Sequence, residues 1–307
     1  MKFANKINGL LVVNKPSGPT SRDIVNIVQK KLGTKAGHTG TLDPLASGVL
    51  VLILGSYTKV SEIITSSAKE YEVSATFGIE TNTLDITGNI IKEEDAIIDY
   101  NRIIKVLNEF KTKYMQEVPR YSAVKVNGKK LYEYARNNIK VKLPKKEVTI
   151  YDTKLLDYKI ENNKTNIKFY TKVSKGTYIR SLINDIAVKL NTSGAMTNLK
   201  RISQGKFSIN DAYTLEDIEK GNYKILKLKD VMDIDQETVN EEEKFKILNG
   251  VSLNKDYDKV LFLDEEGEEL AIYHRKNGKL RMWKMLYKNH WLLFSGFYVV
   301  IYNKKKY

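Results

Sequence analysis

At the start of the chain, the apolar positions predict a strand, a helix, a loop and a second strand. The short apolar run Asn8–Asn14 is typical of a strand. Thr20–Asp23 has the sequence of a capping box, and the apolar residues after it recur at helical spacing until Gly33, where the helix should end. Thr34–Ser47 is rich in glycine and threonine and predicts a loop, whereas the apolar run Gly48–Leu54 predicts a buried strand.

The central part of the chain continues this alternation. Tyr71–Phe77 has strand periodicity, and Asp99 is placed to cap a helix that extends through Phe110. Val148–Tyr158 and Asn166–Val173 predict two paired strands, and Thr177–Leu190 has its apolar residues on one helical face. Strands that alternate with helices, together with several hairpin-like pairs, predict an α+β fold with a mixed sheet.

The last part of the chain has a different pattern. Residues 230–245 are acidic and polar, which favours a domain boundary there. Beyond them, glycine and asparagine turns separate short strand-like runs, a pattern that fits a small β-barrel of about 65 residues. The runs are Val260–Leu263, Leu270–Tyr273, Lys279–Lys284 and Trp291–Val300.

Length and composition exclude several classes of protein. A chain of 307 residues suggests two domains, and 42% hydrophobic residues are enough to form packed cores. No cysteine is present and the three histidines are scattered, so we expect neither disulfides nor a metal site. The longest uncharged run near the C-terminus, Trp291–Tyr302, is too short to span a bilayer, so a cytoplasmic protein without a membrane partner is expected.

The positive charge is concentrated in the middle of the chain. The formal net charge is +14, and residues 101–200 alone carry +14. Within them, Arg120–Glu147 contains nine basic and two acidic residues, with Tyr121, Tyr132 and Tyr134 interleaved. Cations that neutralise phosphates and rings that stack on unpaired bases are typical of an RNA-binding segment. The alternative is a solvated surface hairpin or helix.

One loop holds the residues most suited to chemistry. The sequence contains no phosphate-binding glycine loop, dinucleotide motif or zinc-protease motif, so no cofactor is expected. The glycine-rich loop Gly37–Gly48 instead carries His38 and Asp43. Pro44 keeps Asp43 away from helical dihedral angles, so the loop holds a carboxylate on a stiffened backbone. Taken alone, an aspartate in such a loop is more often a turn residue.

This loop resembles the catalytic motif of the TruB family of tRNA pseudouridine synthases. Other segments resemble the remaining motifs of the family in the same order, and the chain is identified as a member of it. These segments are Lys15–Gly18, Lys69–Glu72 with Phe77-Gly78 and Thr81–Gly88, Tyr121–Arg136, Ser174–Leu182 and Gly194–Phe207.

The resemblance implies a fold, a reaction and a partner. The fold would be a pseudouridine synthase domain over residues 1–235, with a mixed, largely antiparallel sheet, flanking helices and an RNA-binding insertion at about 120–147. A PUA-like domain would follow over 240–307. The reaction would convert uridine 55 in the T loop of tRNA to pseudouridine by base flipping. The enzyme would bind the T arm of tRNA as a monomer, with no cofactor, metal ion or obligate protein partner.

The resemblance also implies three catalytic residues. Asp43 would be the essential carboxylate, which attacks the sugar, attacks the base or assists base departure without a lasting bond. Arg180 would pair with Asp43 and keep it ionised; the alternative is an exposed helix residue. Tyr71 would stack on the flipped base and relay a proton; the alternative is a core tyrosine.

Further residues would contact the RNA. His38 would occupy or shape the space that the flipped base vacates, and Lys15 and Lys125 would bind phosphates. Leu199 would line the uracil pocket, or else belong to the core. The insertion would clamp the T arm and become ordered on binding. The remaining expected RNA contacts are Arg120, Tyr121, Lys129, Lys130, Arg136, Lys175 and Tyr178.

Three other functions are alternatives. A non-catalytic RNA-binding protein or tRNA chaperone would have the same fold without needing Asp43. An archaeal- or eukaryotic-type relative would act within a guide-RNA particle, but it would lack the insertion. A glycoside or nucleoside hydrolase would need a second carboxylate about 5–9 Å from Asp43, and only Asp85 and Glu72 are remote candidates in the sequence.

Overall fold

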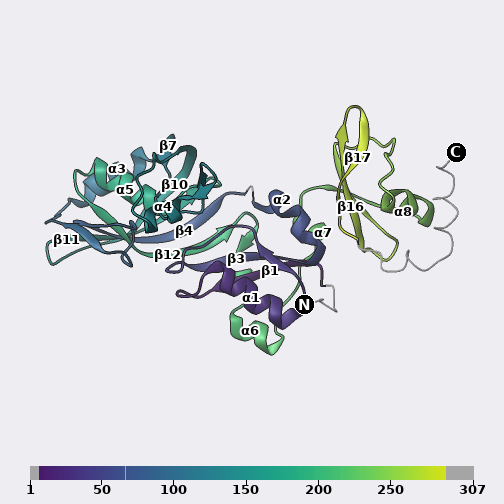
Figure 1. Ribbon diagram of the computed structural model, residues 1–307, viewed down its shortest axis with the longest axis horizontal. Coiled ribbons are helices and arrows are strands. Elements are labelled where there is room, and N and C mark those ends of the chain that lie inside the picture. Colours follow the sequence, from purple (N-terminus) through teal and green to yellow (C-terminus); the bar gives the residue numbers. More distant parts are fainter. Residues whose placement is uncertain (1–6, 66, 288–307) are drawn as a thin grey trace.

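The computed structural model describes residues 7–65 and 67–287, which form a large and a small unit (Figure 1). In the described residues, the large unit is built on a nine-stranded sheet with the order β1-β3-β12-β4-β11-β10-β7, to which β2 and β13 add at β3 and β12. The strands are β1 Gly9–Lys15, β2 Ala36–His38, β3 Ser47–Leu54, β4 Lys69–Phe77, β7 Lys113–Glu117, β10 Lys145–Glu161, β11 Lys164–Val173, β12 Gly194–Gln204 and β13 Phe207–Ser208.

The sheet is mixed, as predicted. All of its pairings are antiparallel except that of β3 with β12, in which Ser47 lies beside Lys200 and Gly48 beside Arg201. The apolar strands β1 and β3 are buried on both faces, which explains why their sequences do not alternate. This parallel pair places the loop before β3 next to the end of β12.

Helices cover one face of the sheet and share a continuous core with it. The helices of this core are α1 Ser21–Leu32, α3 Tyr100–Glu109, α5 Ile179–Lys189 and α6 Leu215–Lys220. The capping box at Thr20 and Asp23 forms as predicted, Gly33 ends α1 with φ 58°, and the Asp99 carboxylate accepts hydrogen bonds at the start of α3. The sequence therefore predicts these helix ends correctly.

Shorter elements complete the large unit. Two small hairpins lie outside the main sheet, β5 with β6 and β8 with β9. The remaining elements of the large unit are η1 Gly55–Val60, α2 Ser61–Thr65, β5 Ile79–Thr81, β6 Ile90–Glu93, β8 Lys125–Val126, β9 Lys129–Lys130, α4 Leu131–Arg136, η2 Ile209–Asp211 and α7 Leu228–Val231.

Over its described residues, which end at 287, the small unit is a four-stranded sheet with one helix. Its elements are β14 Asp235–Thr238, α8 Glu241–Leu248, β15 Lys259–Leu263, β16 Glu269–Lys276 and β17 Lys279–Met285. The predicted strands in 260–284 are confirmed, while the predicted strand Trp291–Val300 lies outside the described residues. Within 235–285 no strand pairing closes this sheet into the expected barrel. The polar segment 230–245, where a domain boundary is predicted, also contains regular structure. Its strand β14 pairs in parallel with β15.

The two units share an apolar junction. Figure 1 shows the small sheet at one end of the molecule, beside α2 and α7. Leu261 and Ile272 of the small sheet pack in one cluster with Val12 and Val51, which lie on the face of β1 and β3 away from α1. At its edge, the buried Glu269 carboxylate accepts hydrogen bonds from the Tyr57 hydroxyl and main-chain N–H groups. No helix in the described part is long and apolar enough to cross a membrane.

Candidate active site

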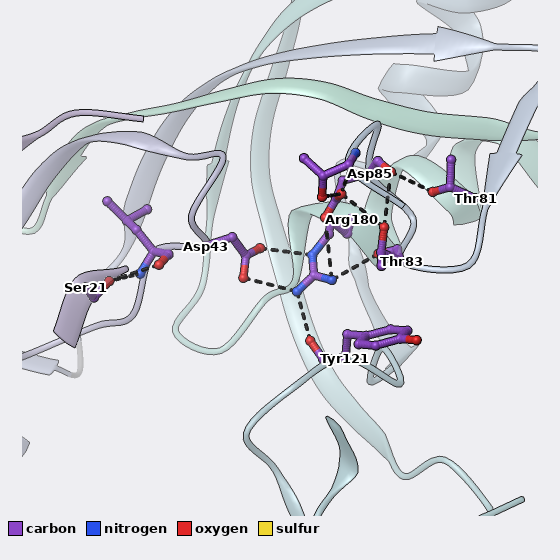
Figure 2. A network of polar contacts seen from close by, with 9 residues as sticks. Ser21, Asp43, Thr81, Thr83, Asp85, Tyr121 and Arg180 are labelled. Atoms are coloured by element: carbon purple, nitrogen blue, oxygen red, sulfur yellow. Dashed lines mark hydrogen bonds and ion pairs between the residues drawn. The ribbon is translucent and has the colours of Figure 1, made fainter. Parts of the chain in front are cut away.

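The loop that carries Asp43 is held rigidly from two sides. The Ser21 hydroxyl, in the first turn of α1, bonds to the main-chain N–H and carbonyl of Leu42 at 2.8 and 2.9 Å (Figure 2). On the other side, the Lys15 ammonium donates to the carbonyls of Pro44 at 3.2 Å and Ala46 at 2.6 Å. The residues before and after Asp43 are therefore fixed by buried hydrogen bonds, which orient its carboxylate before any ligand binds.

The expected role of Lys15 as a phosphate contact is contradicted by its position. The residue is fully buried, and its ammonium also donates to the Pro16 carbonyl at 2.9 Å. Burial lowers the pKa of Lys15 to about 8, although the nearby Asp43 charge acts in the opposite direction. The Lys15 ammonium is hydrogen-bonded to the carbonyls around Asp43. It therefore orders the loop and does not face RNA.

Asp43 and Arg180 form a two-pronged ion pair. Arg180 Nε lies 2.9 Å from one carboxylate oxygen of Asp43, and Nη2 lies 3.1 Å from the other (Figure 2). The Arg180 side chain is only 6% exposed, whereas 34% of the Asp43 side chain remains accessible. Arg180 is therefore not an exposed helix residue. It is a buried support for a carboxylate that a ligand can reach.

Further acceptors fix the guanidinium of Arg180. It donates to the main-chain carbonyls of Thr83 at 3.0 Å and Tyr121 at 3.1 Å. The buried Asp85 carboxylate lies 3.9 Å from Nη1, and the Thr83 hydroxyl and Thr87 N–H each donate to it at 3.0 Å. Together with Asp43, these contacts come from three separate segments, so the orientation of Arg180 depends on the tertiary fold.

A cavity of about 460 Å³ opens beside Asp43. Tyr71 from β4 and Leu199 from β12 form part of its wall, and Tyr178 lies at the start of α5. Tyr71 and Leu199 are each 5% exposed, so both are core residues that also face the cavity. The volume is in the range of sites that bind small organic molecules, which is enough for a nucleoside base and its sugar.

The structure argues against a pair of catalytic carboxylates. Asp43 is the sole acidic residue among the described residues that line the cavity. Asp85 is engaged with Arg180 and the threonines around it, and Glu72 pairs with Lys168 on the adjacent strand. Neither remote candidate faces the cavity, so the hydrolase alternative lacks its second group.

The segment expected to be an RNA-binding insertion folds as the β8–β9 hairpin followed by α4. Tyr121 and Tyr132 from this segment line the cavity. The Lys130 ammonium donates to the Tyr132 hydroxyl at 3.1 Å, and the Arg136 guanidinium lies 5.3 Å from the centre of the same ring. The segment thus brings cations and aromatic rings together beside the cavity.

The other expected contact residues are divided between the cavity and the surface. Lys175 lines the cavity, whereas Lys125, Lys129 and Arg120 are exposed on the insertion. His38 lies in β2 and is not among the residues that line the cavity. Burial, followed by the charges of nearby arginines, lowers the pKa of His38 and so favours its neutral form.

Two residues near the cavity lie in segments that resemble the family but were not among the expected site residues. Arg201 is buried and donates to the carbonyls of Val49 at 2.6 Å and Gly40 at 3.0 Å. Lys69 also lines the cavity, on the same face of β4 as Tyr71. The signal for Lys69 was its spacing of two from Tyr71, which puts both side chains on one face of a strand.

Comparison with known proteins gives consistent matches along the chain. Residues 26–179 match the family model of the TruB family pseudouridylate synthase N-terminal domain, and residues 180–242 match that of the tRNA pseudouridylate synthase B C-terminal domain. A tRNA pseudouridine synthase B of Caldicellulosiruptor saccharolyticus is 41% identical over 81% of this chain and 84% of its own length. The protein of the same name from Mesoplasma florum is 38% identical over 89% and 96%.

Solved structures with the same fold are more distant in sequence. A structure of an H/ACA RNP bound to a substrate RNA containing 2′-deoxyuridine superposes with a TM-score of 0.65 at 22% identity, over 92% of this chain and 86% of the other. A Cbf5-Nop10-Gar1 complex superposes with a TM-score of 0.66 at 23% identity, over 94% and 87%. At this identity the similarity establishes the fold alone.

Proposed function

The chain belongs to the TruB family of pseudouridylate synthases, and from this membership we propose that it isomerises uridine 55 in the T loop of tRNA to pseudouridine. The observation that carries the proposal is the Asp43–Arg180 ion pair beside a cavity with room for one nucleoside. The tRNA named for the relatives is the proposed substrate here as well.

The reaction needs a carboxylate and no redox partner. The bond between C1′ of the ribose and N1 of uracil breaks, the base turns, and C1′ bonds to C5. The proton on C5 leaves and N1 is protonated, so atoms and electrons balance without an oxidant or a reductant. Asp43 serves as the group that attacks the sugar, attacks the base or stabilises the detached base, and the ion pair with Arg180 orients it in each case.

The cavity walls suit an extruded base. A uridine inside a folded T loop must leave its stack, which costs a few kcal/mol that contacts with the protein have to supply. The Tyr71 ring and the Leu199 side chain offer an apolar surface for the base. The Tyr71 hydroxyl is the proposed proton relay, and the Tyr178 ring lies in the same lining.

The charge of the middle of the chain supports T-arm binding. The hairpin and helix of residues 120–147 present Lys125, Lys129 and Arg136 next to the cavity entrance residues Tyr121 and Tyr132. Cations at these positions neutralise phosphates of the T arm. His38, Lys130, Lys175 and Arg120 are proposed as further RNA contacts.

The proposed enzyme has a catalytic domain at 1–235, a PUA-like RNA-binding domain at 240–307 and no obligate protein partner. The bacterial relatives at 38–41% identity support a stand-alone enzyme more strongly than the ribonucleoprotein structures at 22–23% do. The insertion at about 120–147 also supports a stand-alone enzyme.

Mapping the product on a transcript tests the proposal. The purified protein is incubated with unmodified tRNA, and pseudouridine is located by its chemical adduct and reverse transcription. We expect one modified position, uridine 55, and none in a transcript with cytidine there. Modification only outside the T loop, or no modification of any tRNA, would overturn the proposed function.

A further inference from the structure

One wall of the active-site cavity carries four cations. Lys69, Lys146, Lys175 and Arg201 all line it, in addition to the paired Arg180. Among the residues that the structure describes, none of these four takes part in an ion pair with a carboxylate. Since Arg180 already balances Asp43, the wall has an excess of positive charge that no neighbouring side chain neutralises.

Lys69 is the most deeply placed of these lysines. It is 7% exposed, and its ammonium donates to the Ser67 carbonyl at 3.2 Å. The acidic residues beside it do not compensate the charge, because Glu70 points to the other face of β4 and pairs with Lys172 at 3.2 Å. A buried ammonium without a counter-ion is energetically unfavourable, and a bound anion would remove this cost.

The electrostatic surroundings support an anion at this wall. Burial, together with the charges of Arg201, Lys175 and Lys146, lowers the pKa of Lys69 to about 8. All of the neighbouring charges that act on Lys69 are therefore repulsive. An anion bound between them would relieve this repulsion and raise the pKa of the amine toward its ordinary value.

The cations approach the main chain at two glycines that line the cavity. A methyl group on Gly40 would lie 3.4 Å from Lys69 Cε and 3.5 Å from Arg201 Nη1, so these two side chains converge on the same backbone position. A methyl group on Gly176 would lie 1.9 Å from Lys146 Nζ. At Gly176 the absence of a side chain thus lets the Lys146 ammonium lie against the backbone that borders the cavity.

We propose that Lys69, together with Arg201, Lys146 and Lys175, forms a subsite for one phosphodiester group of the RNA, at a linkage that adjoins the nucleotide entering the cavity. This inference rests on the proposed function, because a flipped nucleotide brings its own phosphates to the cavity rim. Phosphate contacts fix the register of a nucleic acid without reading sequence. The subsite thus holds the rotated backbone while Tyr71 and Leu199 hold the base.

Single neutral linkages in a T-arm hairpin test the subsite. One phosphodiester, 5′ or 3′ to the target uridine, is replaced by a methylphosphonate, with a 2′-deoxy sugar on its 5′ side in both the neutral and the charged hairpin. Binding to the full chain is measured by fluorescence anisotropy. For the wild-type protein, we expect one of the two linkages to weaken binding about tenfold to a hundredfold, as for a lost hydrogen bond to a charged group.

The Lys69→Gln variant supplies the decisive comparison. It should bind the charged hairpin about tenfold to a hundredfold more weakly than the wild type does. The neutral linkage should then cause little further loss of affinity, because the substitution and the neutral linkage remove the same contact. Lys172→Gln is the matched control. Its amine pairs with Glu70 on the opposite face of β4, so this variant should keep the full linkage effect.

Two results would overturn the subsite. One is that neither neutral linkage weakens binding to the wild-type protein. This result does not depend on how any variant folds. The other is a Lys69→Gln variant with an unchanged melting temperature that loses as much affinity at the neutral linkage as the wild type does. Failure of the proposed function is distinct, because it would appear as no pseudouridine in any hairpin.

Discussion

Gln116 on β7 and Tyr178 at the start of α5 exchange two hydrogen bonds. The Tyr178 N–H donates to Gln116 Oε1 at 2.8 Å, and Gln116 Nε2 donates to the Tyr178 carbonyl at 3.1 Å. Gln116 is 1% exposed, so water does not replace these bonds. Because Arg180 follows two residues later in the first turn of the helix, the buried amide fixes the position from which the guanidinium reaches Asp43.

Gln116→Ala should impair the chemical step more than RNA binding. The substitution leaves the buried Tyr178 N–H without its partner, while the Tyr178 carbonyl still accepts a hydrogen bond from the Leu182 N–H. The free energy of unfolding should fall by about 2 kcal/mol. A small shift of Arg180 should then reduce kcat about tenfold to a hundredfold while KM stays within about threefold. Steady-state kinetics with tRNA measures both.

Gln29→Ala is the control for this prediction. Gln29 accepts a hydrogen bond from the Ala36 N–H and does not line the cavity. It should lose some stability and keep kcat. Equal kcat values for Gln116→Ala and the wild type would show that Gln116 does not position Arg180.

Lys15→Met should destabilise the catalytic loop and leave the electrostatics of RNA binding unchanged. The methionine keeps the apolar stem and removes the hydrogen bonds to the carbonyls around Asp43. We expect the free energy of unfolding to fall by about 2 kcal/mol, together with a lower turnover rate. The slope of log Kd against log salt should equal that of the wild type, because the ammonium contacts no phosphate.

Lys175→Gln gives the contrasting result. Lys175 lines the cavity as one of the unpaired cations, so its removal should reduce the salt slope by roughly 0.7 to 0.9. A reduced slope for Lys15→Met would restore Lys15 as a phosphate contact.

The sequence predicts the parts of the fold that depend on local chemistry. The capping box at Thr20, the helix stop at Gly33 and the cap at Asp99 involve residues within one turn of each other, and all three are confirmed. The buried strand before residue 55 was equally clear from its continuous apolar run. The Asp43 loop was singled out because glycine and proline constrain it, and the structure places that loop beside the cavity.

Long-range contacts were not readable from the pattern. The resemblance to the family implied that Lys15 binds phosphate, yet its acceptors Pro44 and Ala46 are about thirty residues further along the chain and bury it. The strand β12 was not predicted, because bulges near Met196 and Arg201 interrupt its alternation. Gln116 has no local signal, since its partner Tyr178 lies on a different element.

Gly48→Ala should disrupt the junction of β3 with β12. Gly48 has φ 99°, and a methyl group there would lie 2.2 Å from the Arg201 carbonyl oxygen. The backbone strain and the clash together should lower the free energy of unfolding by at least about 3 kcal/mol, as measured by urea denaturation. Gly128→Ala is the matched control, because Gly128 has φ 81° with open space around it, and it should lose only about 1 kcal/mol. Similar losses of unfolding free energy in the two variants would contradict the close approach of Gly48 to the Arg201 main chain.

Glu269 should make the junction of the two units sensitive to pH. Burial raises the pKa of Glu269 to about 7, against a smaller opposite effect of the Lys229 and Leu228 N–H groups. The folded protein therefore binds a proton more tightly than the unfolded chain does, so the stability due to this group is present at low pH and is lost as pH rises from about 4.5 to 7.

Glu269→Gln isolates this contribution. As pH rises from about 4.5 to 7, the wild type should lose unfolding free energy relative to the variant, by at most about 1.4 kcal/mol per pH unit. Chemical denaturation at several pH values measures it. A difference that does not change with pH would show that Glu269 stays ionised in the folded protein.

The role of Asp43 is tested most directly by single-turnover kinetics of the Asp43→Asn variant on an unmodified tRNA transcript, with tRNA binding measured in parallel. Asparagine has nearly the same shape and cannot ionise, so the cavity and its cationic wall stay in place. We expect the rate of pseudouridine formation to fall on the order of 10⁴-fold or more, while the Kd for tRNA stays within about threefold of the wild-type value. A variant that forms pseudouridine at a rate within about tenfold of the wild type would contradict the assignment of Asp43 as the reacting carboxylate.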